Sequence, residues 1–395
     1  MAITFKNIPD GWAIKKMSDV VKWGSGGTPK ATVKEYYENG TIPWLIIGDL
    51  NNGIVTKSES KITELGLKSS SAKMIPAGTL LVAMYGSIGK LGIAGMECCT
   101  NQAIAYAKEL YGVTTKYMFY FMAMMKSELI SKGKGGTQKN ISQTVLNSLE
   151  VIVPPIEEQE RIVFRIEEML SQLDDGVETL NKTKEQLKVY RQAVLKESFS
   201  EINKQVVLGE ITDSRLGKML DKEKNTGIPR KYLRNVNVRW LKFDLSDLLE
   251  MKIEESEVEK YTVEKNDLVI CEGGEPGRCA IWENDESMFY QKALHRVRFT
   301  DGSNPKFYMY YLWFAAQTGI LRPYFTGTGI KHLTGQSLSK VPVPIAERSI
   351  QDRVVLNIEE RISTCEFIEN TIDNALQQAD ALRQSILKKA FKGEL

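Results

Sequence analysis

Two stretches of the chain carry an apolar residue at every seventh position and almost no residue that interrupts a helix. The first lies within residues 157–199 and follows a pair of prolines; the second ends the chain. Their apolar positions are Ile166, Leu173, Leu180, Leu187 and Val194, then Ile358, Cys365, Ile372, Ala379 and Ile386. Such spacing over several turns is typical of a coiled coil. The pattern predicts two long helices, at 154–200 and 344–395.

A second line of apolar residues, three positions after the first, is expected to complete the seam. It reads Ile368, Ala375 and Leu382 in the second stretch and is weaker in the first, at Met169 and Tyr190. We expect the helices to pack antiparallel about an internal pseudo-twofold axis. The alternative is that each helix packs only on its own globular region. The helix residues predicted to contact a partner are Ile166, Leu173, Leu180, Leu187, Ile358, Ile372, Leu382 and Ile386.

The two helical stretches are copies of one another. Gln159 aligns with Gln351, and Phe199 with Phe391, at a constant offset of 192 residues. Of the 41 positions from Gln159 to Phe199, 14 are identical to their partners, which indicates a duplicated domain pair and not a short-period solenoid. Upstream the copies diverge. The pattern fits a shared scaffold carrying two different binding surfaces, or an ordinary tandem duplication that has drifted.

The regions before the helices, 1–153 and 201–343, have short apolar runs broken by glycine. Such runs, for example 78–86 and 266–274, are typical of strands. Each region also has one aromatic stripe with helical spacing, around Phe121 and around Phe307, which we expect to be core and not a base-stacking surface. The predicted fold class is α+β: two mixed, β-rich domains joined by two long antiparallel helices.

Charge and cysteine content narrow the classes of function. The net charge is only +2, but the helical stretches 157–199 and 347–395 sum to −3 and −2, so the remainder carries +7. Two mildly basic regions between acidic helices are a modest signal for nucleic acid. Five scattered cysteines predict no disulfide framework and no metal site, and favour a reducing cytoplasm. No stretch reaches the ~20 apolar residues of a membrane span, so we expect a soluble protein.

A short glycine motif occurs once in each globular region. Its members are Gly86, Ser87, Gly89 and Lys90 in the first copy and Gly274, Gly277 and Arg278 in the second. A tight turn ending in a cation can present that charge and backbone N–H groups to a phosphate. It is not a nucleotide-binding P-loop, since the spacing differs. A hairpin turn with a solvated cation is the equally weighted alternative.

A second glycine-bearing motif precedes each long helix. Its candidate DNA contacts are Thr137, Gln138, Lys139 and Asn140 in the first copy and Thr328, Lys331 and His332 in the second. Glycine allows close approach of the backbone, and Gln, Asn and Lys side chains can read base edges. We favour DNA contact here. Ser142 and Thr334 can equally well cap the short helix that follows.

Residues for catalysis are harder to find. The sequence has neither the Asn-Pro-Pro-aromatic nor the Asp-Pro-Pro-Tyr loop of an amino-methyltransferase, no evident glycine-rich loop for S-adenosylmethionine, and no ATP-binding P-loop. Two histidines without a cysteine cluster leave few candidates for general-base or metal chemistry. We therefore predict a non-enzymatic protein with no catalytic residue, no metal ligand and no cofactor of its own.

Several motifs, in their order along the chain, resemble the specificity subunits of type I restriction–modification systems. They comprise residues 8–12 (Ile-Pro-Asp-Gly-Trp), 42–44 (Ile-Pro-Trp), 136–142, 153–163, 232–237 and 272–282. Within 232–237, Arg234 and Asn235 are further candidate DNA contacts. The resemblance covers essentially the whole chain.

The resemblance implies two target recognition domains, each reading one half of a bipartite site in double-stranded DNA. It implies that the helices set the gap between the half-sites and dock two methyltransferase subunits that modify adenine N6. Those subunits would bind S-adenosylmethionine. Motor-nuclease subunits of a restriction complex, with ATP and Mg²⁺, would join them.

This chain departs from the family pattern in two places. The second region lacks an entry like Gly11-Trp12, and its proline-rich junction at 341–348 is offset from the first. Two other functions stay open: a stand-alone DNA-binding regulator, and a coiled-coil scaffold whose globular domains bind proteins.

Overall fold

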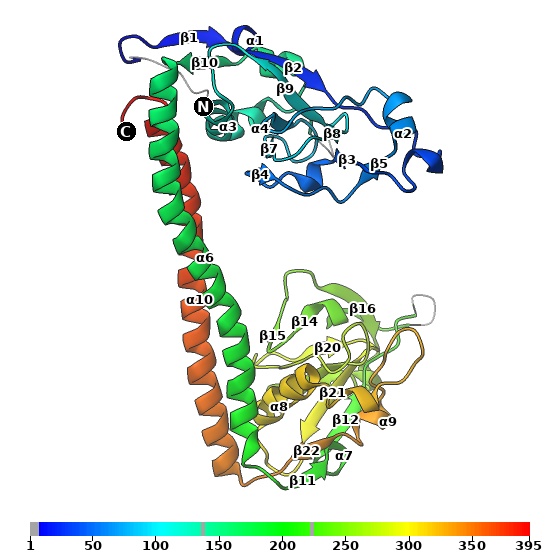
Figure 1. The fold of residues 1–395 in the computed structure, drawn as a ribbon. Coiled ribbons are helices and arrows are strands. Elements are labelled where there is room, and N and C mark those ends of the chain that lie inside the picture. The colour runs from blue at the N-terminus through cyan, green and yellow to red at the C-terminus, as the bar shows by residue number, and fades with distance from the viewer. Residues whose placement is uncertain (1–7, 136–138, 222–224) are drawn as a thin grey trace. The chain divides into compact units, whose positions relative to one another are not determined.

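The chain forms two compact units, and each contains a mixed α/β domain together with part of both long helices (Figure 1). The computed structural model describes residues 8–135, 139–221 and 225–395. Unit 1 comprises Met1–Leu180 with Asn374–Leu395, and unit 2 comprises Asn181–Asp373. Both domains combine small sheets with short helices, which confirms the predicted α+β class.

Unit 1 is built around a five-stranded sheet of order β2-β9-β6-β7-β4, a three-stranded sheet β5-β3-β8 and the pair β1-β10. Its strands are β1 (Ala13–Lys16), β2 (Val21–Ser25), β3 (Ile42–Leu45), β4 (Ile54–Val55), β5 (Lys61–Ile62), β6 (Leu80–Ala83), β7 (Leu91–Ala94), β8 (Cys99–Thr100), β9 (Ile104–Leu110) and β10 (Glu150–Val153). Its short helices are α1 (Met17–Val20), α2 (Glu64–Lys68), α3 (Thr115–Met124), α4 (Lys126–Lys132) and α5 (Gln143–Asn147), with 3₁₀ turns η1 (Lys34–Tyr36) and η2 (Ile47–Asp49).

Unit 2 has two four-stranded sheets, β12-β21-β18-β19 and β16-β13-β20-β17, and the pairs β11-β22 and β14-β15. Its strands are β11 (Gln205–Val207), β12 (Thr212–Leu216), β13 (Ile228–Leu233), β14 (Val238–Arg239), β15 (Lys242–Phe243), β16 (Leu249–Ile253), β17 (Thr262–Val263), β18 (Leu268–Cys271), β19 (Cys279–Ile281), β20 (Met288–Tyr290), β21 (Leu294–Phe299) and β22 (Pro342–Pro344). Its short helices are α7 (Leu208–Ile211), α8 (Pro305–Thr318) and α9 (Gly335–Leu338), with 3₁₀ turns η3 (Asn235–Asn237), η4 (Glu255–Glu257) and η5 (Arg322–Tyr324).

The long helices are α6 (Ile156–Ser200) and α10 (Arg348–Ala390). The second begins four residues later than position 344, because β22 and a three-residue connection, 345–347, occupy that junction. In unit 1 the first part of α6 contacts the last part of α10, and in unit 2 the last part of α6 contacts the first part of α10. Arg383 pairs with Asp174 in unit 1, and Arg191 pairs with Glu369 at 2.7 Å in unit 2. The two helices are therefore antiparallel in each unit.

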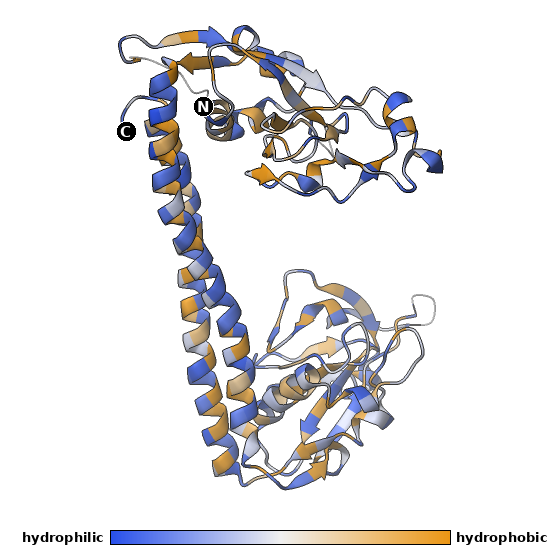
Figure 2. Cartoon of the chain, in the orientation of Figure 1, coloured by the Kyte–Doolittle hydropathy of each residue, from blue (hydrophilic) through white to orange (hydrophobic). Residues whose placement is uncertain are grey.

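The first predicted seam is correct, but most of the companion seam is wrong. Only Ala375 is half-buried, and Tyr190 accepts a hydrogen bond from Arg361 of the opposite helix at 3.0 Å. Every residue of the first line is buried or half-buried, including Ile166, Ile358 and Ile386. In the expected second line, by contrast, Leu382 is 51% exposed and Met169 and Ile368 are also exposed. Figure 2 shows how polar and apolar residues alternate along both helices.

The true companion line lies four residues after the first, not three. It mixes apolar residues, such as Leu170, Ile362 and Leu376, with charged ones, such as Arg191, Glu369 and Arg383. These charged residues form ion pairs across the helix pair. A search for apolar residues passes over this line because charged residues interrupt it, and those positions suit the interface through ion pairing.

Each domain core is completed by the beginning of one long helix and the end of the other. Phe391, at the end of α10, packs edge-to-face on Tyr117 and Phe121 of α3 in unit 1. The equivalent Phe199, at the end of α6, packs on Phe307, Tyr311 and Phe314 of α8 in unit 2. The aromatic stripes are therefore core, as predicted, and the duplication is repeated in the contacts.

Candidate nucleic-acid interface

The first glycine motif forms a tight hairpin turn in both units, between β6 and β7 and between β18 and β19. Gly86 and Gly89 have φ values of 62° and 73°, and Gly274 and Gly277 have 75° and 90°. Side-chain-bearing residues rarely adopt these values, so the spacing of two glycines three positions apart follows from the turn itself. The motif is thus explained by backbone geometry before any ligand is considered.

The cation that ends each turn is tied to the protein's own backbone. Lys90 Nζ donates to the carbonyl oxygens of Ile47 and Gly48, each at 3.2 Å. The Arg278 guanidinium donates to the Asn235 carbonyl at 2.9 Å and pairs with Glu275. Both acceptor segments are equivalent 3₁₀ turns, η2 and η3. A phosphate contact by either cation stays a prediction, and it would require these bonds to open.

The second glycine motif lies against the first in both units. In unit 1 the Gly86 N–H donates to the Lys139 carbonyl at 3.0 Å, and the Ile141 N–H donates to Met84 at 2.9 Å. In unit 2 the Leu333 N–H donates to the Glu272 carbonyl at 2.7 Å, the bond that corresponds to Ile141–Met84. Two motifs about fifty residues apart in the sequence therefore form one continuous surface, which we call the turn–loop surface.

The turn–loop surface consists of residues 85–90, 134–135 and 139–142 in unit 1 and residues 273–278 and 326–334 in unit 2. Its exposed candidates are Gly86, Ser87, Lys139, Asn140, Gly274, Thr328 and Lys331, and His332 is half-exposed. Gly89 and Gly277 are buried in the turns. Thr137 and Gln138 lie outside the described residues.

Several groups on this surface have structural partners. Lys331 Nζ donates to the Gly327 carbonyl at 2.7 Å, which curls the unit 2 loop back on itself. Ile330, at the tip of that loop, is 74% exposed and was not among the sequence candidates. Ser142 and Thr334 cap α5 and α9, so the capping role considered for them is confirmed.

Arg234 and Asn235 organise the unit 2 surface from within. Arg234 pairs with Asp247 at 2.7 Å, and Asn235 Nδ2 donates to the Gly273 carbonyl at 2.8 Å, next to the turn. Both side chains are half-buried. The structure therefore places Asn235 against the turn through its Nδ2 group, whereas Arg234 is tied to Asp247. Asn235 Oδ1 and Arg234 Nε are buried without a hydrogen-bond partner.

His295 supports the same loop from the buried side and was not singled out in the sequence. Its Nε2 lies 3.1 Å from the Leu333 carbonyl, so a neutral imidazole with a proton on Nε2 donates to that oxygen. Burial lowers the pKa of His295 below its usual value, which favours this neutral form. Unit 1 has no described counterpart, because its aligned strand β9 contains no histidine.

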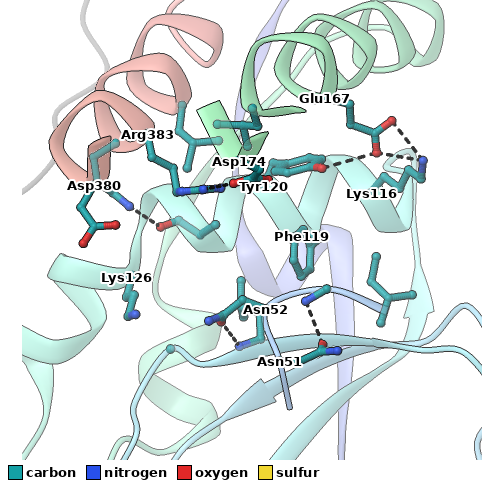
Figure 3. Close-up of a pocket in the computed structure, with 18 of the residues that line it drawn as sticks. Asn51, Asn52, Lys116, Phe119, Tyr120, Lys126, Glu167, Asp174, Asp380 and Arg383 are labelled. Carbon is teal, nitrogen blue, oxygen red and sulfur yellow. Dashed lines mark hydrogen bonds and ion pairs between the residues drawn. The ribbon is translucent and has the colours of Figure 1, made fainter. Parts of the chain in front are cut away.

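A cavity of unit 1, about 910 Å³, lies where α3, α6 and α10 meet, and its lining includes Gly89 of the turn–loop surface (Figure 3). Lys116 pairs with Glu167 at 2.8 Å, and Arg383 pairs with Asp174. Burial, followed by the neighbouring Glu167 carboxylate, raises the pKa of Tyr120 to about 12. The acidic side chains Glu167, Asp174, Asp175 and Asp380 line the cavity. Lys116, Lys126 and Arg383 also line it, so four carboxylates face three cations, and the slightly acidic balance makes the cavity a poor match for DNA phosphates.

Other features of the described residues bear on chemistry. Within residues 8–135, 139–221 and 225–395, no three His, Cys, Asp or Glu side chains are grouped so as to hold a metal ion. All five cysteines are free and buried. Of the helices that the structure describes, none combines the length and apolarity required to cross a membrane.

Sequence comparison connects both repeats with DNA specificity. The model of the "Type I restriction modification DNA specificity domain" matches residues 9–189 and 203–378. The EcoKI specificity subunit of Escherichia coli K12 is 22% identical over 98% of this chain and 90% of its own length. The EcoR124I/EcoR124II specificity subunit of Escherichia coli is 31% identical over 41% of each chain.

Solved structures share the fold over the full length. A chain from a structure on complex assembly and conformational transition of the type I R-M system has a TM-score of 0.78, with 15% identity, 99% coverage of this chain and 100% of that chain. The HsdS subunit from Thermoanaerobacter tengcongensis has a TM-score of 0.56 and 16% identity, with 99% of each chain covered. With both repeats matched and the same architecture, this chain belongs to the type I restriction–modification DNA specificity family.

Proposed function

We propose that each unit reads one half of a bipartite site in double-stranded DNA through its turn–loop surface. The observation that carries the proposal is that two separate motifs converge on one exposed surface, and that they do so twice in a chain with two specificity domains. The surfaces are built alike but differ in side chains, with Lys139 and Asn140 in one and Thr328, Lys331 and His332 in the other. Different side chains on a common frame suit two different half-sites.

The roles of the candidate residues follow from their exposure. Exposed side chains such as Ser87, Lys139, Asn140 and Thr328 are assigned to DNA contact, with lysines on phosphate or guanine and asparagine on adenine. Lys90, Arg278, Arg234 and Asn235 are assigned to holding the surface in shape, because each is half-buried and already donates a hydrogen bond within the protein.

The helix pair is proposed to dock two copies of one methyltransferase subunit. Its outer face carries an equivalent apolar residue in each copy, Phe164 and Leu356, each 66% exposed. Beside them lie equivalent ion pairs, Lys116–Glu167 at 2.8 Å and Lys306–Glu359 at 2.9 Å. A surface that is present twice suits a partner that binds twice. Among the predicted contact residues Leu382 is exposed, whereas Ile166, Ile358, Ile372 and Ile386 are buried within the chain.

The chemistry is assigned to the partners. S-adenosylmethionine would be bound by the methyltransferase subunits that modify adenine N6, and ATP and Mg²⁺ by restriction subunits where these join. This chain would then be a non-catalytic reader. A cytoplasmic location is part of the proposal, since free cysteines persist in reducing compartments.

The decisive experiment is a base-modification map of the host genome with and without this gene. We expect N6-methyladenine to disappear from one bipartite motif when the gene is removed, while the partner methyltransferase is still expressed. An unchanged map would contradict the proposal. In that case, binding of the isolated chain to DNA with a steep salt dependence would favour a regulator, and absence of binding a protein scaffold.

Charge reversal tests the assignment of one half-site to one unit. Lys139→Glu is expected to weaken recognition of one half-site, and Lys331→Glu that of the other, because each places a carboxylate beside DNA phosphates. The measurement is methylation of duplexes with mutated left or right halves. Lys15→Glu, in the exposed strand β1, is the matched control. Equal loss on both halves with either variant would contradict the assignment.

A further inference from the structure

Gln159 joins the first turn of α6 to the recognition domain of unit 1. Its side chain is fully buried. The amide oxygen accepts a hydrogen bond from the Thr114 N–H at 2.9 Å. The amide nitrogen donates to the carbonyl oxygens of Gly112 and Pro154, both at 2.9 Å. Both N–H groups of the side chain are thus used, and the acceptor and donor ends are distinguished by their partners.

Gln351 makes the equivalent set of bonds at the start of α10 in unit 2. It is 1% exposed. Its amide oxygen accepts from the Asn304 N–H at 2.7 Å, and its nitrogen donates to the Ala346 carbonyl at 2.9 Å and to Ser303 Oγ at 3.3 Å. The same joint therefore occurs twice, although the segments that it connects differ in sequence.

Each glutamine holds the residue that starts the aromatic helix. Thr114 caps α3 by accepting from the Tyr117 N–H, and Asn304 caps α8 by accepting from the Lys306 N–H. The backbone N–H of the same cap residue is bound by the glutamine. One uncharged side chain thus links the cap of the domain's central helix, the loop before it and the entry to the long helix.

The bonds are directional and leave little freedom. A buried apolar contact tolerates sliding, but a donor and an acceptor with three fixed backbone or hydroxyl partners do not. A carboxylate in this place would put negative charge against carbonyl oxygens, and a lysine would lack the acceptor that the cap N–H needs. Glutamine is the side chain of this length that supplies both functions without charge.

We propose that Gln159 and Gln351 are positioning residues that fix the orientation of each recognition domain on its long helix and so restrict binding to one spacing between the half-sites. This inference rests on the proposed function. Loss of either glutamine would free the angle of one domain, while the DNA-contacting loops of the turn–loop surface keep their shape. Spacing, and not the bases of the half-sites, is what should change.

The test uses the full complex with its methyltransferase in the host, where the genome offers both half-sites at many separations. Gln159→Met and Gln351→Met keep the side-chain length and remove all three bonds. We expect methylation at sites one base pair longer or shorter than normal to rise about tenfold, with unchanged half-site bases. Two matched controls, Leu81→Ala in the unit 1 sheet core and Gln192→Met on the exposed face of α6, should retain the normal spacing.

Each outcome decides the matter. Relaxed spacing in either variant supports the proposal, and methylation confined to the normal spacing, at full or reduced level, overturns it. If one variant does not assemble with the methyltransferase, the other variant tests the equivalent glutamine in the other unit. A variant that assembles only in part can still be tested, because the assembled fraction methylates the genome. A wild-type map without a bipartite motif would instead refute the proposed function, so the two failures are distinguishable.

Discussion

Units 1 and 2 place different chemistry at the same position of the same fold. Just before β6, Thr79 is buried and its hydroxyl donates to the Pro76 carbonyl at 2.7 Å. At the equivalent position before β18, Asp267 is buried and accepts from the Glu264 N–H at 2.7 Å. Proline has no N–H to offer, so a donor suits unit 1, whereas an acceptor suits unit 2.

The carboxylate in unit 2 brings a further requirement. Asp267 forms a two-pronged pair with Arg298, with both N–O distances at 2.7 Å, and this pairing raises the pKa of the arginine. The unit 1 strand has Lys108 at the aligned position, and it is exposed. The units thus share the buried glutamines, the hairpin turns and the phenylalanines at the helix ends. They differ in the hydrogen bonds and ion pairs that their buried polar residues make. The duplicated domains have therefore kept the same fold, while the buried polar side chains at equivalent positions have changed.

The largest effect is expected from removing the aromatic side chain that each long helix contributes. Phe391→Ala should destabilise unit 1, and Phe199→Ala unit 2, each by about 3–5 kcal/mol, since a buried aromatic cluster is left with a cavity. Hydrogen exchange resolved by segment would report which unit opens. Phe367→Ala, at a site 72% exposed, is the control and should change stability little. Loss of protection in the opposite unit would contradict the observed packing.

Substitution of the two interior polar residues, Asp267 and Thr79, should change stability by a smaller amount, and by different amounts in the two units. Asp267→Ala is expected to cost unit 2 about 2–3 kcal/mol, less than removal of one partner from a fully buried pair, because Arg298 keeps partial contact with water. Thr79→Ala should cost unit 1 only about 1 kcal/mol, the value of one neutral hydrogen bond. Chemical denaturation monitored by exchange in β6 and β18 measures both. Equal losses would remove the distinction drawn between the units.

Removal of an ion pair between the two long helices should destabilise the two units by amounts that differ less. Glu369→Ala, which removes the partly buried partner of Arg191, is expected to destabilise unit 2 by about 1 kcal/mol. Asp174→Ala breaks the more exposed pair of the equivalent arginine, Arg383, in unit 1 and should cost less. Thermal unfolding at low and high salt tests the ranking, with Glu185→Ala on the exposed helix surface as the control. A larger loss from Asp174→Ala would reverse the ranking.

The smallest expected effect is on the pH dependence of stability. His295 should make the stability of unit 2 depend on pH, and unit 1 has no histidine at the aligned strand. Because burial lowers the pKa of His295 in the folded protein, the unfolded chain binds its proton first as the pH falls. The histidine's contribution is present above its unfolded pKa of about 6.5 and is lost as the pH falls through the lower folded value. Exchange protection of the loop at 326–334 between pH 7.5 and 5 should therefore decline, and His295→Asn should flatten the change. An unaltered slope in that variant would exclude His295 as the cause.

Much of the architecture was predictable from local patterns. The duplication, the two helices and the first seam, from Ile166 to Ile386, follow from periodicity, since burial of one helix face imposes a seven-residue spacing wherever it occurs. The aromatic core helices follow for the same reason. The two glycine motifs were also recognised, because left-handed turns restrict residue type at single positions.

The tertiary structure decided which groups are available and which are engaged. Lys90 and Arg278 look like free cations in the sequence, but a 3₁₀ turn about forty residues away supplies their acceptors. The companion seam contains Arg191 and Glu369, which become suitable interface residues only when the opposite helix brings the counter-charge. Gln159 and Gln351 were visible as identical positions of the repeat, but their bonds depend on loops far away in the chain. Periodicity reports what one element buries, whereas hydrogen bonds and ion pairs are properties of two elements, so the sequence determined the frame and only the assembled fold determined the partners.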